Sequence, residues 1–321
     1  MTDTSPTNGV TQNRTLAAAA AVLGYAMIIG FTDNFVRVIA EDFGLWQFHA
    51  TRSAMALVLL AVLAVGLGMR LRPKNLGAVA FRSITHGCAM LIYFGALAFL
   101  PVAQVAAGLF TAPIFVLLVQ RFTLGRQIGL LQVFAVGVGF LGVVLVLGPS
   151  ALAGATLSAV LPVLSGALYA VGNIATREMC AEETAETMLA GFFVVLCVFG
   201  LVGMAVLAFL PVVAAEGADG FILRGAAWPD AAFLWWTFVQ ASGSLLGVGL
   251  IIKAYQLAEA SRVSVFEYVI LPCSAAWGWV LWSETLTASA IAGMAMIVLA
   301  GALVSRQPST ASRQWRRHSD T

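Results

Sequence analysis

Charged residues are scarce in this 321-residue chain: 10% of it is Asp, Glu, Lys or Arg, whereas 60% is hydrophobic. Soluble domains carry about a quarter charged residues, so this composition argues against a water-soluble globule. A chain of this kind must fold with lipid as its main solvent. The 17 basic and 15 acidic residues give a net charge of +2, which is too small to suggest nucleic acid as a partner.

Residues that hold metals or perform catalysis are also few. The four cysteines stand singly, without a CxxC pair or a metal-type spacing, and only three histidines occur, one of them in the C-terminal tail. The sequence contains no GxSxG or HExxH motif, so we expect neither an enzyme nor a cofactor. The intramembrane polar residues are heterogeneous, whereas a channel would repeat one polar ring across several spans. An intramembrane enzyme and a channel remain the alternatives from other classes.

Long apolar runs, in contrast, fill most of the chain. A bilayer-spanning helix needs about 20 mostly apolar residues, and this length predicts ten spans joined by short loops. The first follows a polar N-terminus and is too long for a signal-peptide core, so we interpret it as an uncleaved helix. The predicted spans are 16–36, 45–68, 78–99, 102–122, 128–147, 156–176, 187–210, 231–252, 263–282 and 288–305.

The distribution of Lys and Arg predicts the orientation. With the N-terminus in the cytoplasm, most basic residues lie at the inner face and only Arg37, Arg52 and Arg224 fall outside it. We therefore expect a multi-pass protein of a bacterial inner membrane with both termini cytoplasmic. The tails are 1–15 and the basic, lipid-facing 306–321.

Two similar halves are visible in the order of features. "FLPVAQVAAGLFTAPIFV" from Phe99 and "LAEASRVSVFEYVILPCS" from Leu257 each join a helix-breaking linker to a span with a proline inside it, Pro113 or Pro272. Five spans per half make the second half enter the membrane from the opposite side. The sequence therefore predicts an all-α integral membrane protein of ten transmembrane helices, arranged as two inverted five-helix repeats, 16–150 and 151–305. Interrupted spans at matching positions favour a secondary transporter over simple kinks.

These motifs resemble the ten-span, EamA-type members of the drug/metabolite transporter superfamily. The resemblance rests on "LPVAQVAAGLFTAPIFVLLVQRFTLGR", "AEASRVSVFEYVILPCSAAWGWVLWSETLT", "NFVR" and "FHATRSAMAL" and covers most of the chain. The first half departs from the family, because "LGRQ" has Arg126 where an acidic residue often follows the glycine. The resemblance implies a central cavity lined chiefly by spans one, three, four, six, eight and nine, and a permease for small organic metabolites.

Four ionisable residues lie inside the predicted spans. Each costs about 2.5–3.5 kcal/mol at the bilayer centre on insertion scales, so such groups usually face a cavity or a partner. Depth sorts them into an outer pair, Asp33 and Arg52, and an inner pair, His86 and Glu267. For the outer pair we expect a structural salt bridge between spans one and two, with an outer gate as the alternative.

Glu267 lies in an interrupted span that the resemblance places against the cavity. We interpret it as a carboxylate that meets a cation or a coupling proton; the alternative is a plain inter-helix pair with Arg82 or His86. His86 is either a site residue or a buried histidine bonded to a carbonyl or hydroxyl group.

Uncharged polar and aromatic residues complete the predicted substrate site. An aromatic-walled cavity with amide and hydroxyl groups suits an aromatic or amino-acid-like zwitterionic metabolite, which we expect the protein to export. Uptake of a larger aromatic or cationic metabolite, similar to S-adenosylmethionine or a flavin-type vitamin, is the alternative. Beyond this metabolite, the bilayer and possible coupling protons, we expect no obligate protein partner. The additional candidates are Asn34, Tyr93, Phe110, Tyr169, Asn173, Gln240, Tyr268 and Trp277.

Overall fold

The computed structural model describes residues 7–96, 102–148, 160–210, 212–283 and 285–305, and every regular element among them is a helix. This confirms the predicted all-α membrane class. The helices are α1 (Thr7–Asp33), α2 (Val36–Asp42), α3 (Leu45–Leu67), α4 (Leu76–Ala96), α5 (Val102–Leu109), α6 (Ala112–Phe122), α7 (Leu130–Leu147), α8 (Val160–Glu178), α9 (Ala185–Phe209), η3 (Gly217–Gly220), α10 (Ala231–Leu257), α11 (Ala260–Phe266), η4 (Glu267–Val269), α12 (Ile270–Trp282) and α13 (Ala288–Ser305).

The ten predicted spans correspond to ten helical segments of the described chain. Nine of them are long and apolar enough to cross a bilayer, if α1 with α2, α5 with α6, and α11 with α12 each count as one. The tenth is α8, which is more polar because it carries Asn173, Thr176 and Arg177. α1 begins at Thr7, so helix extends into the predicted N-terminal tail. The predicted C-terminal tail, 306–321, lies outside the described residues.

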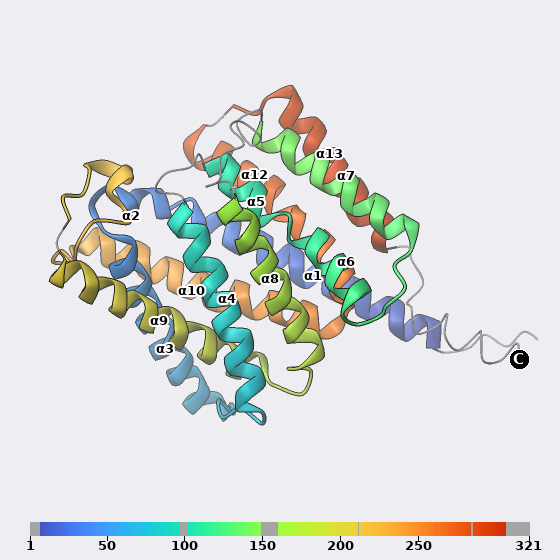
Figure 1. Cartoon of the computed structure of the whole chain (residues 1–321), viewed down its shortest axis with the longest axis horizontal. Helices are drawn as coiled ribbons and strands as arrows, with labels where there is room; N and C mark the ends of the chain where they lie inside the picture. The colour runs from blue at the N-terminus through green and yellow to red at the C-terminus, as the bar shows by residue number, and fades with distance from the viewer. Residues whose placement is uncertain (1–6, 97–101, 149–159, 211, 284, 306–321) are drawn as a thin grey trace, which may run out of the picture.

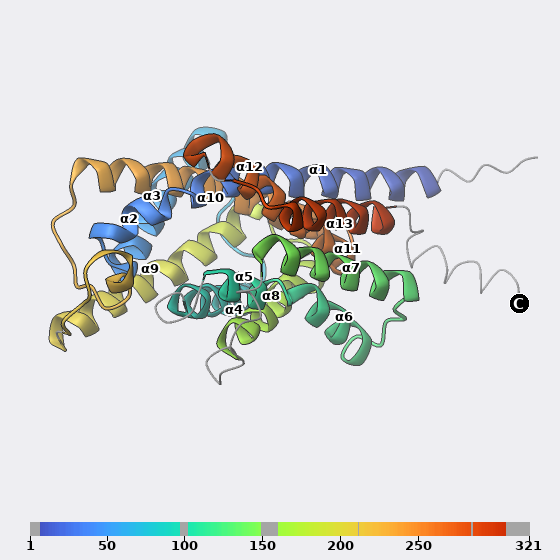
Figure 2. The same cartoon turned by 90° about the horizontal axis from the view of Figure 1, so that it is seen from above.

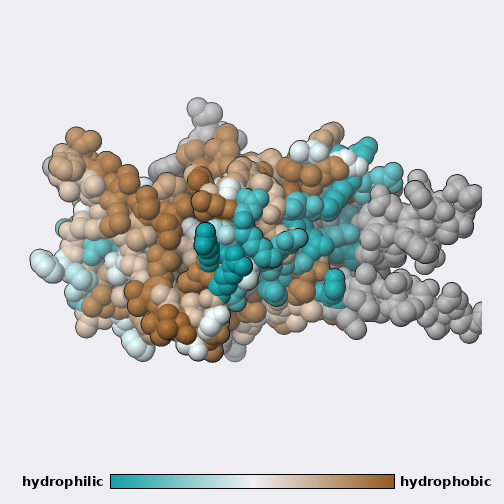
Figure 3. Space-filling model, turned by 90° about the horizontal axis from the view of Figure 1, so that it is seen from below, coloured by the Kyte–Doolittle hydropathy of each residue, from teal (hydrophilic) through white to brown (hydrophobic). Residues whose placement is uncertain are grey.

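The outer surface of the bundle is largely apolar. Large hydrophobic side chains such as Val65, Leu130 and Phe209 are exposed to the surroundings of the bundle. Figure 3 shows hydrophobic residues over much of one face, whereas hydrophilic residues gather toward the end from which the tails emerge. Since exposed apolar surface on this scale is costly in water, this arrangement fits a helix bundle surrounded by lipid.

Helices from the two halves of the chain pack in pairs. α1 lies along α10, α3 along α9, α4 along α8, and α7 along α13, while α6 contacts α11. In Figure 2 the α1–α10 pair and the α4–α8 pair lie on opposite sides of the bundle, with α12 on the side of α1 and α10, and with α11 between the two pairs. In Figure 1 the α7–α13 pair lies at one side of the bundle, beside α12 and α6.

This pairing has an internal symmetry. The paired spans are one with eight, two with seven, three with six, four with nine, and five with ten. If every span is exchanged for the one five positions away, the same set of pairs results. Two repeats related by a twofold axis would give this pattern; the inverted repeat and its boundaries stay predictions.

Spans four and nine are both interrupted, as their prolines predict. The break in span four is at Phe110 and Thr111, and that in span nine is the 3₁₀ turn η4. Both breaks precede the proline: Pro113 is the second residue of α6 and Pro272 the third residue of α12. A proline is tolerated in the first turn of a helix, where its missing N–H has no intrahelical partner. Each proline therefore begins a new helical segment.

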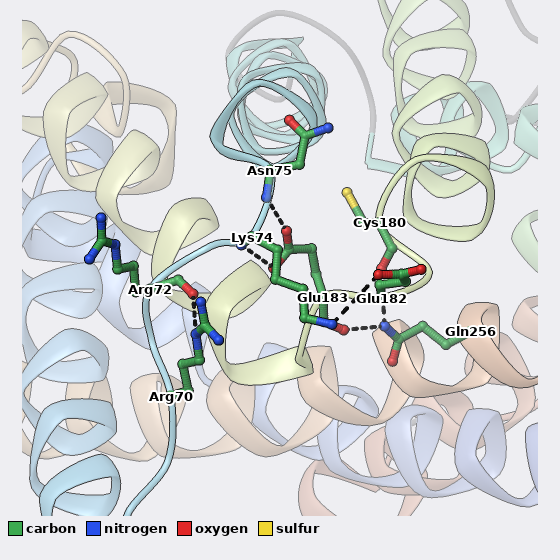
Figure 4. Close-up of polar contacts among 8 residues, drawn as sticks. All are labelled: Arg70, Arg72, Lys74, Asn75, Cys180, Glu182, Glu183 and Gln256. Carbon is green, nitrogen blue, oxygen red and sulfur yellow. Dashed lines mark hydrogen bonds and ion pairs between the residues drawn. The ribbon is translucent and has the colours of Figure 1, made fainter.

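A buried glutamate joins three segments between the spans. The two carboxylate oxygens of Glu183 accept hydrogen bonds from the backbone N–H groups of Lys74 and Asn75, at 3.1 and 2.6 Å, just before α4 begins. Gln256 at the end of α10 donates to the backbone oxygens of Glu183 and Cys180, at 2.7 and 3.3 Å. Figure 4 shows these contacts converging on one short turn. The turn thus links α4, α8 and α10.

Replacing Glu183 by alanine is expected to lower the free energy of unfolding by about 1–3 kcal/mol, because two partly buried backbone donors lose their acceptor. The matched control is Glu182→Ala. The Glu182 side chain is 87% exposed and lies 3.6 Å from Lys74 Nζ. Such a surface pair contributes about 0–1 kcal/mol. Thermal unfolding of both variants in detergent measures the difference; equal losses would contradict the assigned role of Glu183.

Candidate functional site

A cavity of about 160 Å³ lies among the helices of both halves. All six spans that were expected to line a cavity contribute side chains, and α3 and α9 add one each. The lining residues are Tyr25, Ile29, Asp33, Arg52, Arg82, His86, Met90, Tyr93, Phe94, Leu109, Phe110, Ala112, Pro113, Tyr169, Phe192, Ser244, Val248, Ile251, Ser264, Glu267 and Ile270.

Glu267 is one of two carboxylates, with Asp33, that line this cavity. The break between α11 and α12 places it at the cavity wall, where it is 7% exposed. Its Oε1 atom accepts hydrogen bonds from Tyr255 and, at 3.4 Å, from Asn173, while Oε2 accepts one from Tyr169 at 2.8 Å. Three donors from α8 and α10 therefore hold the carboxylate in place.

The predicted inter-helix pair of Glu267 with Arg82 or His86 is not formed. Arg82 instead donates to Thr176 Oγ1 at 3.1 Å and to a backbone carbonyl at 3.2 Å. His86 Nε2 lies 2.9 Å from the side-chain oxygen of Asn173, so the amide connects the histidine indirectly to the carboxylate. Among the described residues, no Lys, Arg or His side chain lies within ion-pair distance of Glu267.

The predicted salt bridge between Asp33 and Arg52 is also absent. Asp33 Oδ1 accepts a hydrogen bond from Gln240 Nε2 at 2.7 Å, and the Gln240 amide is fixed by Ser244 at 2.9 Å. Arg52 lies 3.4 Å from His49 Nδ1 through Nη2. A residue from the second half thus holds the carboxylate, and the two charged side chains line the cavity separately.

Six of the other sequence candidates either line the cavity or hydrogen-bond to its carboxylates. Tyr93, Phe110, Tyr169 and Pro113 line the cavity, together with the charged residues above. Asn173 and Gln240 lie one layer behind, where they orient Glu267 and Asp33.

The remaining four candidates neither line the cavity nor hydrogen-bond to its carboxylates. The Tyr268 hydroxyl donates to Phe110 O at 3.2 Å, and Asn34 Nδ2 donates to Gly30 O of its own helix at 2.6 Å. Trp277 Nε1 donates to Met27 O at 3.0 Å, which fastens α12 to α1. Pro272 begins α12 behind the break.

Sequence reasoning missed several lining or supporting residues. Tyr25 shares one face of α1 with Asp33, eight residues later, and Tyr255 lies eleven residues after Ser244 on α10. Phe94 and Phe192 are further aromatic lining residues. Both tyrosines could have been found by searching each helix for residues four, seven, eight or eleven positions from a polar residue. These spacings place two side chains on the same face of a helix.

Arg126, which departs from the family pattern, has a structural contact. Its Nη2 atom lies 2.9 Å from each oxygen of the Glu178 carboxylate. The pair joins the segment after α6 to the end of α8, so this cation connects the two halves at the bundle's end.

Comparisons with known proteins agree with this geometry. The sequence model of the EamA-like transporter family matches residues 16–148, close to the first predicted repeat. The pseudopaline exporter of Pseudomonas aeruginosa (strain UCBPP-PA14) is 26% identical over 79% of this chain and 84% of its own. The chain is an EamA-type protein of the drug/metabolite transporter superfamily.

Two riboflavin transporters are also similar to this EamA-type protein. That of Brucella anthropi is 26% identical over 84% of this chain and 88% of its own, and that of Vibrio cholerae 23% identical over 94% and 97%. A solved crystal structure with 16% identity superimposes with a TM-score of 0.69 over 91% of this chain and 97% of that chain, which supports the fold. The protein is therefore a multi-pass membrane transporter of small metabolites.

Proposed function

We propose that this transporter is a secondary carrier that moves an amphoteric metabolite with an aromatic part across the bacterial inner membrane, in the direction of export. The supporting observation is one cavity whose wall contains Glu267, Asp33 and Arg52 together with aromatic side chains. A ligand with both cationic and anionic groups matches such a wall, whereas a purely apolar ligand would leave the buried charges without partners.

The interrupted spans support alternating access. Breaks in spans four and nine occur at equivalent places beside the cavity, and broken helices at the interface of two repeats are typical of carriers with a midplane site. The paired packing of the two halves is compatible with rocking of one inverted repeat against the other. Glu267 would then meet a cationic group of the metabolite or a coupling proton.

The orientation follows from basic residues at one end. Arg70, Arg72 and Lys74 precede α4, and Arg177 follows at the end of α8, in the same region as the Glu183 turn. An excess of Lys and Arg in short loops favours a cytoplasmic location. We therefore propose that this end and both termini face the cytoplasm.

Two relatives bear on the direction and substrate. The pseudopaline exporter supports export of a small organic metabolite. The riboflavin transporters, together with Tyr93, Phe94, Phe110 and Tyr169 in the cavity wall, support the second candidate, uptake of a larger aromatic vitamin.

Transport by reconstituted vesicles tests the proposal. Aromatic amino acids, their derivatives and riboflavin would be supplied on either side, with and without an imposed proton gradient. We expect saturable, gradient-stimulated movement of at least one amphoteric compound. Movement that increases linearly with concentration without saturation, as through a pore, would contradict a carrier.

A further inference from the structure

Arg52 is a buried cation with an incomplete set of partners. It lies at the start of the third turn of α3, is 6% exposed and lines the cavity. One terminal nitrogen contacts His49 at 3.4 Å, and the guanidinium carbon lies 5.1 Å from the centre of the Phe48 ring. Its Nε atom is buried without a hydrogen-bond partner. A buried charge left in this state is costly, so the site is arranged for a further group.

A comparison with Arg82 shows that this is not a general property of the buried arginines. Arg82 lines the same cavity and is 2% exposed, but two of its three nitrogens donate hydrogen bonds, Nε to Thr176 and Nη1 to the backbone oxygen of Met188. Its guanidinium carbon also lies 5.9 Å from the centre of the Phe192 ring. Arg82 is thus anchored by two hydrogen bonds, whereas Arg52 has a single hydrogen-bond contact, at 3.4 Å to His49.

Asp33 supplies the opposite charge at the same part of the cavity. The residue is exposed, and its carboxylate accepts a hydrogen bond from the neutral amide of Gln240. Asp33 and Arg52 lie close enough to attract each other electrostatically but are not within the 4 Å of an ion pair. A space bordered by a carboxylate and a guanidinium that form no ion pair with each other matches a ligand group that carries an ammonium and a carboxylate on the same carbon atom.

We propose that Asp33 and Arg52 bind the head group of an α-amino acid, with its ammonium group against Asp33 and its carboxylate against Arg52. The inference rests on the proposed carrier function and names its substrate class. A guanidinium presents N–H donors in a fork that matches the two oxygens of a carboxylate. Phe94 lines the cavity and packs 4.9 Å from the His49 ring, so an aromatic wall begins beside this head-group site. The body of the substrate extends from there toward Glu267.

Three phenyl compounds separate the two charges. Phenylalanine carries both, phenylalaninamide lacks the carboxylate and 3-phenylpropionate lacks the ammonium group. Ligand-dependent melting of the full-length protein in detergent gives an apparent Kd for each, because binding to the folded state raises the melting temperature. The wild-type protein is expected to bind phenylalanine more tightly than either analogue.

Two variants then assign each charge to a residue. Arg52→Met is expected to weaken phenylalanine binding about tenfold or more while leaving phenylalaninamide binding unchanged. Asp33→Asn is expected to weaken phenylalanine binding to a similar extent while leaving 3-phenylpropionate binding unchanged or tighter. Arg121→Met, which removes an exposed cation from the last turn of α6, is the control and should bind all three compounds as the wild type does.

The outcomes separate this site from other roles. The proposal is overturned if the wild type binds phenylalanine no better than the two analogues, or if Arg52→Met weakens all three compounds equally in a folded protein. Equal weakening would indicate a gate or a structural role. Selective binding without vesicle transport would leave the head-group site standing and contradict the proposed carrier function instead.

Discussion

Glu267→Gln is expected to reduce transport at least about tenfold and to remove its response to an imposed proton gradient. The substitution preserves the size of the side chain but removes the charge that meets a cation or proton at the cavity wall. Tyr169 and Tyr255 donate to this carboxylate, His86 contacts its amide partner Asn173, and Tyr25 and Tyr268 are further ionisable neighbours. Initial transport rates in vesicles, with and without the gradient, measure the effect.

The change should be tolerated by the fold. One tyrosine hydroxyl must reverse to accept a hydrogen bond from the new amide, which costs about 1 kcal/mol. Tyr169 is such a hydroxyl, since it hydrogen-bonds Glu267 Oε2 at 2.8 Å and also lies beside the Tyr25 side chain. Glu182→Gln, on the exposed turn before α9, is the control and should transport normally. Wild-type rates with an intact gradient response in Glu267→Gln would refute the assignment of this residue.

The spans and their order were predictable from the sequence because lipid imposes a simple rule. A spanning helix must be apolar over about 20 residues, and its ends are marked by polar or basic residues. The exact breaks were less predictable. Pro113 and Pro272 indicated the correct spans, but each break precedes its proline, since proline is accommodated in the first turn of the following segment.

The sequence identified ionisable residues of the cavity wall but could not tell which of them touch. It grouped Asp33 with Arg52 and His86 with Glu267 by their expected depth, and all four line the cavity. Whether two residues at the same depth touch depends on how each helix is rotated about its axis and on which other side chains compete for the contact. The sequence alone indicates neither. Gln240, 207 positions after Asp33 in the sequence, donates a hydrogen bond to the Asp33 carboxylate, for which the sequence predicted Arg52 as the partner. Asn173 similarly comes between His86 and Glu267.

Gly172→Ala is expected to destabilise the protein by about 1–3 kcal/mol and to reduce transport strongly. Gly172 lies on α8 where it packs against α4, and a Cβ atom there would overlap the His86 ring. The ring must move, which breaks its 2.9 Å contact with Asn173 and loosens a donor to Glu267. Helix propensity alone predicts the opposite sign, since alanine is favoured over glycine by about 1 kcal/mol. Thermal unfolding in detergent and vesicle transport measure the two effects.

A second substitution distinguishes this collision from a general intolerance of α8. If the His86 ring is the obstacle, His86→Ala makes room for the new methyl group, so the double variant should lose less stability than the sum of the two single losses. Gly137→Ala is the control, because a Cβ atom there would have no neighbour within 4 Å. Strictly additive losses in the double variant would show that Gly172 is required for a reason other than His86. Transport should nevertheless stay low in the double variant, because Asn173 then lacks the histidine that orients its amide toward the carboxylate.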